Sequence, residues 1–221
     1  MTQPNKAFIF DMNGTMIDDM KYHTEIWYEM LNKDLGASMT YEQVKLQMYG
    51  KNEELLERVF GKSRFTPEEM NHYVIEKEKR YQKLYRPHMK LIDGLDIFFK
   101  EAANQNIPMS IGSAAGVFNV DYILDNLNLR HYFKCIVCAE DVKESKPHPE
   151  TFLLAANSMG VEPENCIVFE DAPKGVECAQ NAGMKCVVLT TAHEAKDFEK
   201  YDNLLAIVKD YTDPCLKALT V

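Results

Sequence analysis

Short apolar runs rich in β-branched residues alternate with amphipathic runs along most of the chain. The apolar runs have the length of buried strands and cover residues 7–10, 108–112, 135–139, 166–169 and 186–189. The stretches with apolar residues at helical spacing, each followed by Gly or Asn as a stop signal, cover residues 94–106, 117–128, 149–160 and 172–183. This alternation of strand and helix predicts the α/β fold class, a doubly wound parallel sheet with helices on both faces.

About ninety residues separate the first two predicted strands, far more than a loop or one crossover helix requires. The content of this segment is helical. Apolar residues recur at helical spacing within 20–36, and Thr66 followed by Glu69 forms a capping box before a longer helix. We therefore expect two domains, an α-helical cap at residues 17–90 and a discontinuous core at residues 1–16 and 91–221.

The charge and hydropathy of the chain argue against nucleic-acid and membrane partners. The chain has 25 Lys and Arg against 34 Asp and Glu and contains no basic block, so we expect no nucleic-acid partner. No stretch reaches the roughly 18 consecutive apolar residues of a membrane span, and the first apolar run ends in Asp11 instead of a signal-cleavage site. We expect a cytoplasmic monomer that does not bind membranes.

The cysteines indicate a reduced protein. There are six of them, scattered through the C-terminal half, and several lie inside apolar runs where a free thiol acts as a small core residue. Cys135 and Cys138 have the spacing of metal ligands, but residues three apart in a strand point to opposite faces. We expect neither zinc nor a disulfide at this pair.

Polar residues follow the predicted strands. Asp11 comes directly after the first strand, Ser113 after the second, Lys146 beyond the third, and Glu170 with Asp171 after the fourth. In an open parallel sheet, ligands bind outside the carboxyl ends of the strands. Taken singly, each residue also fits a turn, a helix cap or a solvated loop. Together they predict a site with a nucleophilic carboxylate, a hydroxyl, a cation and an acidic pair.

Four segments around these residues, FDMNGT, IGSAAG, SKPHPE and FEDAPKGVECAQNAG, closely resemble the four ordered motifs of the haloacid dehalogenase superfamily. The helical insertion after the first motif, with KYHTEIW just inside it, is most similar to the β-phosphoglucomutase-like branch. The resemblance covers nearly the whole chain. It implies a Rossmann-like core and an enzyme that transfers phosphoryl groups on small phosphorylated metabolites.

The resemblance also implies roles for residues at the strand ends. Asp11 is then the nucleophile that forms an aspartyl-phosphate, and Lys146 balances the negative charge between this carboxylate and the substrate phosphate. Ser113 and the backbone amides after it, beginning with Ala114, then bind the phosphoryl oxygens.

A magnesium site is implied in the same way. Its ligands are the Asp11 carboxylate, the backbone carbonyl of Asn13, Asp171, and Glu170 either directly or through water. Oxygen ligands of this kind suit Mg²⁺, a hard cation.

The chain departs from the superfamily pattern at Asn13, where a second Asp usually acts as general acid and base. Asn keeps the backbone carbonyl that binds the metal but removes the titratable proton. Three explanations stay open: the Asn is engineered, it is native and another residue transfers the proton, or catalysis is lost. The nearest substitute bases are His23, Asp18 and Asp19.

Within the predicted cap, the resemblance points to substrate contacts from His23, from Gly50, Lys51 and Asn52 in an interhelix turn, and from Lys77 on the last helix. His23 and Lys77 can also be interpreted as residues on exposed helix surfaces. Glu53 stands where mutases carry an arginine for a second phosphate. The exchange weakens the case for a mutase.

These observations predict a Mg²⁺-dependent phosphatase acting on a small sugar phosphate. The alternatives are a β-phosphoglucomutase and a catalytically impaired, ligand-binding homologue. A minor alternative is a hydrolase similar to phosphonoacetaldehyde hydrolase, in which Lys51 would form a Schiff base. Lys146 in place of the arginine typical of that branch, together with Ser113, favours the phosphatase.

Overall fold

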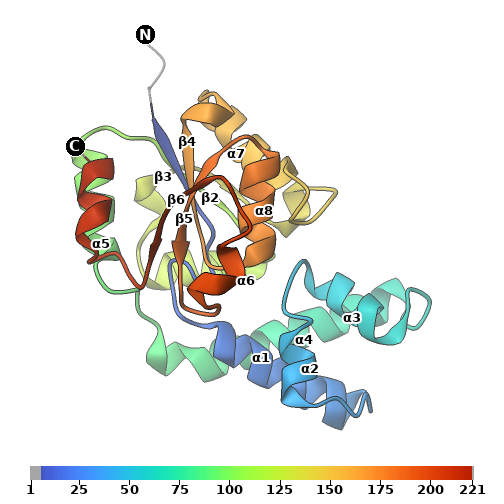
Figure 1. Cartoon of the computed structure of the whole chain (residues 1–221). Coiled ribbons are helices and arrows are strands. Elements are labelled where there is room, and N and C mark those ends of the chain that lie inside the picture. The colour runs from blue at the N-terminus through green and yellow to red at the C-terminus, as the bar shows by residue number, and fades with distance from the viewer. Residues whose placement is uncertain (1–5, 221) are drawn as a thin grey trace. The chain divides into compact units, whose positions relative to one another are not determined.

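A computed structural model describes residues 6–220 of the chain. The chain divides into two compact units (Figure 1). The α/β unit comprises the residues up to Asp18 and those from Lys90 onward, and the helical unit comprises Asp19–Met89. Ile17 and Asp18, the first two residues of the insertion expected from the sequence, lie in the α/β unit, where Ile17 forms a bridge with Leu91.

The α/β unit is built on one sheet of six parallel strands in the order β3-β2-β1-β4-β5-β6. The strands are β1 (Ala7–Phe10), β2 (Met109–Gly112), β3 (Phe133–Val137), β4 (Cys166–Glu170), β5 (Lys185–Leu189) and β6 (Leu204–Val208). The predicted fold class is confirmed.

Two details of the predicted strands are wrong. β3 begins at Phe133 and ends at Val137, earlier than the predicted run 135–139. β6 was not predicted, although LLAIV is apolar, because β5 and β6 are joined through a short 3-10 turn at Ala195–Phe198 instead of a crossover helix. The alternation of strand and helix is lost at this edge of the sheet.

Helices cover both faces of the sheet (Figure 1). They are α5 (Leu95–Asn104), α6 (Val117–Asn126), α7 (Glu150–Met159) and α8 (Pro173–Asn181). On one face Phe152 of α7 and Val176 of α8 pack with Ile9. On the other face Phe98 of α5 packs against Phe169, whose ring stacks on Phe10 at a centroid distance of 4.6 Å. Two apolar layers thus fix the central strands, whose ends carry the predicted site.

The helical unit contains α1 (Met20–Glu29), which continues into a wider π-helical turn (Met30–Asp34), α2 (Tyr41–Lys45), α3 (Asn52–Phe60) and α4 (Pro67–Tyr85). The capping box predicted at Thr66 is present, because its hydroxyl accepts the Glu69 amide at 3.2 Å and Glu69 Oε2 accepts the Thr66 amide at 2.9 Å. The core of the unit includes the buried side chains of Trp27, Leu56 and Tyr81.

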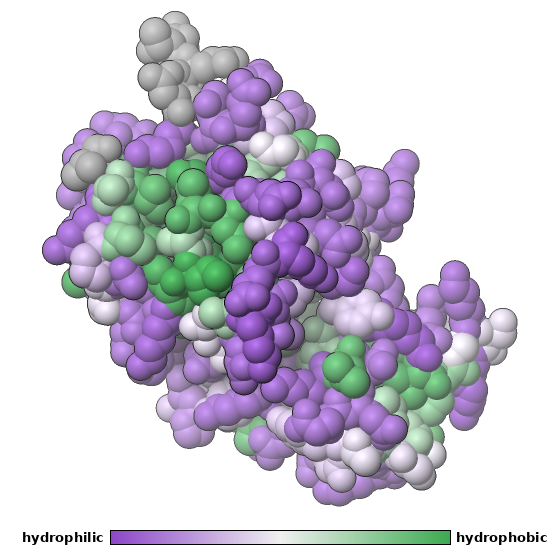
Figure 2. Space-filling model, in the orientation of Figure 1, coloured by the Kyte–Doolittle hydropathy of each residue, from purple (hydrophilic) through white to green (hydrophobic). Residues whose placement is uncertain are grey.

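The surface in the view of Figure 2 is mostly hydrophilic, with an apolar area over edge strand β6, where Leu205 and Ile207 are exposed. Among residues 6–220, none of the helices is long and apolar enough to cross a membrane. The six cysteines are free thiols, and burial raises the pKa of the Cys138 and Cys178 thiols to about 12.

Candidate active site

The register of the central strands brings the predicted residues to one edge of the sheet. Phe10 of β1 lies beside Phe169 of β4 and Ile111 of β2. The backbone amide of Asp11 therefore donates to the carbonyl of Phe169 at 3.0 Å. The chain builds outward from β1 first to one side and then, from β4, to the other. Asp11 consequently stands at the topological switch point, where open α/β sheets bind ligands.

A buried lysine joins two of the carboxylates. Lys146 Nζ lies 2.7 Å from Asp11 Oδ1 and 2.7 Å from Glu170 Oε1, and all three side chains are buried. Burial alone lowers the pKa of Lys146, but the charges of Asp11 and Glu170 outweigh it, so that this pKa lies above its usual range. Lys146 therefore keeps its charge and holds Asp11 in a fixed orientation.

The acidic pair is fixed by hydrogen bonds. Glu170 Oε2 accepts the backbone amides of Asp171 and Ala172, both at 2.9 Å. Thr15 donates its hydroxyl to Asp171 Oδ1 at 3.2 Å. Thr15 lies in the FDMNGT segment, but the sequence gives it no separate signal.

Glycines make room for the same pair. Gly14 adopts a φ of +79°, and a Cβ at this position would stand 2.1 Å from Asp171 Oδ2. A Cβ at Gly175, in the first turn of α8, would stand 1.7 Å from Glu170 Oε1. Side chains at either position would displace a carboxylate, which is why this edge of the sheet needs glycine.

The three carboxylates are suited to a divalent cation. One oxygen each from Asp11, Glu170 and Asp171 lies within 4.8 Å of the others. Burial, then the charges of Glu170 and Asp11, raise the pKa of Asp171 well above its usual range. Lys146 balances only one of these negative charges, and the donor set consists of hard oxygen atoms. Charge and ligand type therefore fit Mg²⁺.

Ser113 and Asn13 stand in the two loops beside Asp11. The Ser113 amide donates to the Val137 carbonyl at 2.9 Å, and its hydroxyl accepts the Ala115 amide at 3.1 Å. Ala114 and Asn13 are half-buried. The structure thus brings Asp11, Lys146, Glu170 and Asp171 together through direct contacts or close carboxylates, and places Ser113 and Asn13 in the adjoining loops.

The helical unit contains a second buried polar group. His23 and Lys77 are 6% and 2% exposed, so the interpretation of either as a surface residue is wrong. Lys77 Nζ lies 2.7 Å from His23 Nδ1, and His23 Nε2 lies 3.1 Å from Asp19 Oδ2. An ammonium group can only donate, which assigns the imidazole proton to Nε2 and lets it donate to Asp19. Tyr81 also donates to Asp19.

The segment from Gly50 to Asn52 differs slightly from its prediction. Gly50 has a φ of +73°, and Lys51 donates its backbone amide to Glu54 Oε2 at 3.1 Å. Asn52 is the first residue of α3 instead of a turn residue. The helix begins there because Lys51 is its N-cap residue, and Glu54 accepts the backbone amide of Lys51. Asn52 Nδ2 donates to Glu78 Oε1 at 2.8 Å. Glu78 was not predicted, since one acidic residue in a charged helix gives no signal of burial.

The fold and the site together define an α/β protein with a buried charged cluster at its switch point that can hold a divalent cation. The chain belongs to the haloacid dehalogenase-like hydrolases, because a model of this family matches residues 8–189. The superfamily resemblance stated from the motifs is confirmed.

Several similar proteins are named as phosphatases or as β-phosphoglucomutases. The chain is 31% identical over 182 residues to the fructose-1-phosphate phosphatase YqaB of Escherichia coli, covering 82% of this chain and 94% of that protein. It is 36% identical over 183 residues to an uncharacterized protein of Haemophilus influenzae, covering 82% and 89%. The β-phosphoglucomutase of Clostridium difficile has a similar structure, with a TM-score of 0.84, 26% identity, and coverage of 97% and 95%. The predicted enzyme class, a phosphatase or phosphoglucomutase-like hydrolase, is therefore confirmed.

Proposed function

We propose that this protein is a Mg²⁺-dependent phosphatase that hydrolyses a small sugar phosphate through an aspartyl-phosphate on Asp11. The observation that carries the proposal is the buried contact of Asp11 with Lys146 beside Glu170 and Asp171. The Asp11 carboxylate forms a bond to phosphorus while the bond from phosphorus to the sugar oxygen breaks. Water then cleaves the acyl phosphate, which releases inorganic phosphate and restores the carboxylate.

The residues of the α/β unit divide this work. Lys146 orients Asp11 and offsets the charge that the substrate phosphate adds. The Ser113 hydroxyl, which accepts the Ala115 amide, can donate its proton to a phosphoryl oxygen. Asp11, Asp171 and Glu170, together with the Asn13 carbonyl, would hold Mg²⁺, which supplies positive charge next to the transferred phosphoryl group. Asn13 cannot supply the proton that the leaving oxygen needs, so in this chain the oxygen takes it from water.

The helical unit supports a phosphatase over a mutase. A mutase must hold phosphate at both ends of its substrate, which calls for a free arginine. Glu53 is exposed, and Arg58 donates to the carbonyls of Gln47 and Tyr49 at 2.7 Å while its guanidinium stacks on the Tyr49 ring at 3.8 Å. Arg58 is thus used to hold the turn before α3. We propose that the helical unit acts as a cap, with His23, Asn52 and Lys77 contacting the leaving group, beside the turn formed by Gly50 and Lys51.

A phosphate-release screen tests the proposal. Sugar monophosphates, glucose 1-phosphate and phosphonoacetaldehyde are offered to the chain and to Asn13→Asp in the presence of Mg²⁺. We expect hydrolysis of one or more sugar monophosphates by at least the Asp form. Isomerisation of β-glucose 1-phosphate would instead indicate a mutase, and borohydride trapping of phosphonoacetaldehyde on Lys51 would indicate a phosphonate hydrolase. If both forms are inert while phosphate analogues raise Tm, the protein is a ligand-binding homologue.

Magnesium should stabilise the protein more strongly as pH rises. Because the pKa of Asp171 is raised in the folded state, the metal-free folded protein holds a proton that the unfolded chain has already released above about pH 4. The free energy of unfolding of the metal-free protein should therefore fall as pH rises from about 4, where the unfolded chain loses this proton, to the raised pKa of Asp171 in the folded state. Mg²⁺ replaces that proton, so the increase in Tm caused by about 5 mM Mg²⁺ (about 10² times a Kd of roughly 50 μM) should be larger at pH 7.5 than at pH 5.5.

Differential scanning fluorimetry at both pH values measures this effect. Asp171→Asn should remove most of the Mg²⁺-dependent increase, whereas Asp96→Asn, an exposed position on α5, should keep it. An increase in Tm that is equal in Asp171→Asn and the parent chain would contradict the assignment of Asp171 as a ligand.

A further inference from the structure

Glu78 of α4 is a buried carboxylate with donors on only one of its two oxygens. Its Oε1 accepts from Asn52 Nδ2 at 2.8 Å and from Lys77 Nζ at 2.9 Å. Its Oε2 is buried and has no hydrogen-bond partner among the described residues, and the residue is 5% exposed. Leaving a buried charged oxygen without a donor is costly. The described residues therefore supply donors to one oxygen of this carboxylate and none to the other.

Glu78 is ionised in this environment. Burial alone raises its pKa, but the charge of Lys77, the proximity of His23 and the hydrogen bonds from Lys77 and Asn52 outweigh it, and the pKa of Glu78 lies below its usual range. An ionised carboxylate oxygen only accepts hydrogen bonds. It repels a phosphate group and binds hydroxyl or ammonium donors.

Three helices meet at this carboxylate. Lys77 links it to His23 of α1 through a contact of 2.7 Å, and Asn52 brings the first turn of α3 to it. His23, Asn52 and Lys77 are the residues to which we assign contacts with the leaving group. Glu78 belongs to the same network, so the missing donor is expected to come from the leaving group.

We propose that Glu78 is a specificity-determining residue that accepts a hydrogen bond from a hydroxyl of the leaving group at its Oε2. This inference rests on the proposed phosphatase function and narrows its substrates to monoesters of polyhydroxy alcohols that carry a single phosphate. Lys77 already balances the charge of Glu78, so a neutral hydroxyl fits this position better than an ammonium group. A second phosphate on the leaving group is disfavoured at this position, because a phosphate dianion carries only acceptor oxygens and cannot supply the donor.

The test compares Glu78→Gln with its parent in the Asn13→Asp background. The glutamine can keep its oxygen on Asn52 and Lys77, but it presents NH₂ where Oε2 stood, so an acceptor becomes a donor at constant shape. Substrates are the best sugar monophosphate of the screen, fructose 1,6-bisphosphate, and phenyl phosphate, whose leaving group carries no further hydroxyl. Glu76→Gln is the matched control, because Glu76 lies on the same helix, is partly exposed and pairs with Arg80. Glu78→Asp keeps the charge if the glutamine variant fails to fold.

We expect Glu78→Gln to lower kcat/KM for the sugar monophosphate by about 10- to 100-fold, mainly through KM, because its hydroxyl now meets a donor. Phenyl phosphate should change less than about twofold, and the preference for monophosphate over bisphosphate should fall. Glu78→Asp should also lower kcat/KM for the sugar monophosphate relative to kcat/KM for phenyl phosphate. The shorter side chain moves the acceptor oxygen away from the hydroxyl. An equal change for both esters, or none, overturns the inference.

A binding measurement separates this inference from the proposed function. If the parent hydrolyses no ester, the same esters are titrated calorimetrically into the unmodified chain and into its Glu78→Gln variant. A selective loss of affinity for the sugar ester would keep the role of Glu78 while the phosphatase proposal fails. Equal affinities of the two chains for each ester would overturn the role of Glu78.

Discussion

Asp11→Asn should abolish phosphate release, lowering kcat by roughly 10⁴-fold or more, as loss of a covalent nucleophile does in other enzymes. The amide has nearly the same shape but cannot form the acyl phosphate. Lys146 still has Glu170 at 2.7 Å, so the ammonium group is not left without a carboxylate. The fold should therefore persist, which circular dichroism and thermal unfolding can verify. Initial rates of phosphate release measure the loss.

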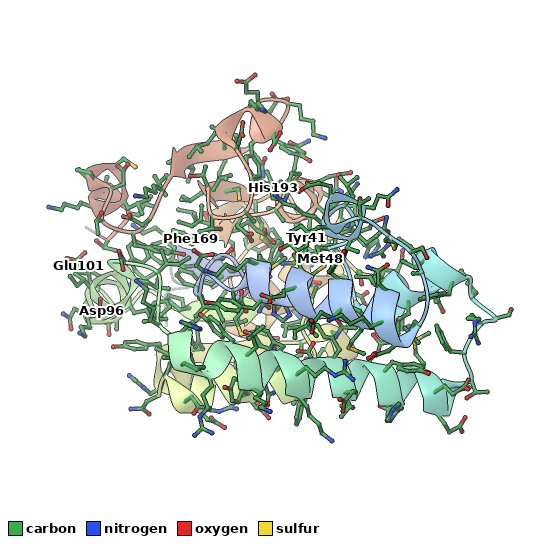
Figure 3. All side chains as sticks on the ribbon, turned by 90° about the horizontal axis from the view of Figure 1, so that it is seen from below. Tyr41, Met48, Asp96, Glu101, Phe169 and His193 are labelled. Atoms are coloured by element: carbon green, nitrogen blue, oxygen red, sulfur yellow. The ribbon has the colours of Figure 1, made fainter. Side chains whose placement is uncertain are left out.

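Asp96→Asn is the control for this substitution, because Asp96 lies on α5 with an exposed side chain (Figure 3). It should retain the activity of its parent. Trapping of a phosphoryl group on Asp11, seen by mass spectrometry after rapid acid quenching, should disappear in Asp11→Asn. Residual turnover within tenfold of the parent (about 1.4 kcal/mol in the barrier) would show that another residue attacks phosphorus.

Asn13→Asp should raise kcat for sugar phosphates by roughly 10²- to 10⁴-fold, the usual contribution of general acid–base catalysis. A sugar alkoxide is a poor leaving group and needs a proton as the bond to phosphorus breaks. A nitrophenolate leaves without one, so p-nitrophenyl phosphate should gain much less in the same step. The ratio of the two rate increases measures how far proton transfer limits turnover in the unmodified chain.

Asn104→Asp, at an exposed position at the end of α5, provides the same chemical change away from the site and should leave both rates unaltered. Equal rates of the unmodified chain and Asn13→Asp on a sugar phosphate would show that Asn13 does not limit turnover. Another group would then transfer the proton. Asp19 is buried and accepts hydrogen bonds from His23 and Tyr81, and Asp19→Asn would then be the first variant to test for loss of this proton transfer.

The sequence determined the class of fold because its signals are local. Apolar runs of strand length and helical spacing between them need no knowledge of distant contacts. The same reasoning missed β6, where the connection contains no helix, and displaced β3 along the chain. The motif residues at the strand ends were readable because a parallel sheet gathers the carboxyl ends of its strands at one edge.

Tertiary structure alone decided how these residues contact one another. The pairing of Lys146 with Asp11 and Glu170 joins positions more than twenty residues apart, and no spacing in the sequence encodes it. The burial of Lys77 and Glu78 could not be predicted from the sequence for the same reason. The charged segment EKEKRYQK is typical of a solvent-exposed helix, and only the packing of α1 and α3 against α4 buries these two side chains. Local patterns set where strands and helices form, whereas the charge state and reach of a side chain depend on neighbours that only folding supplies.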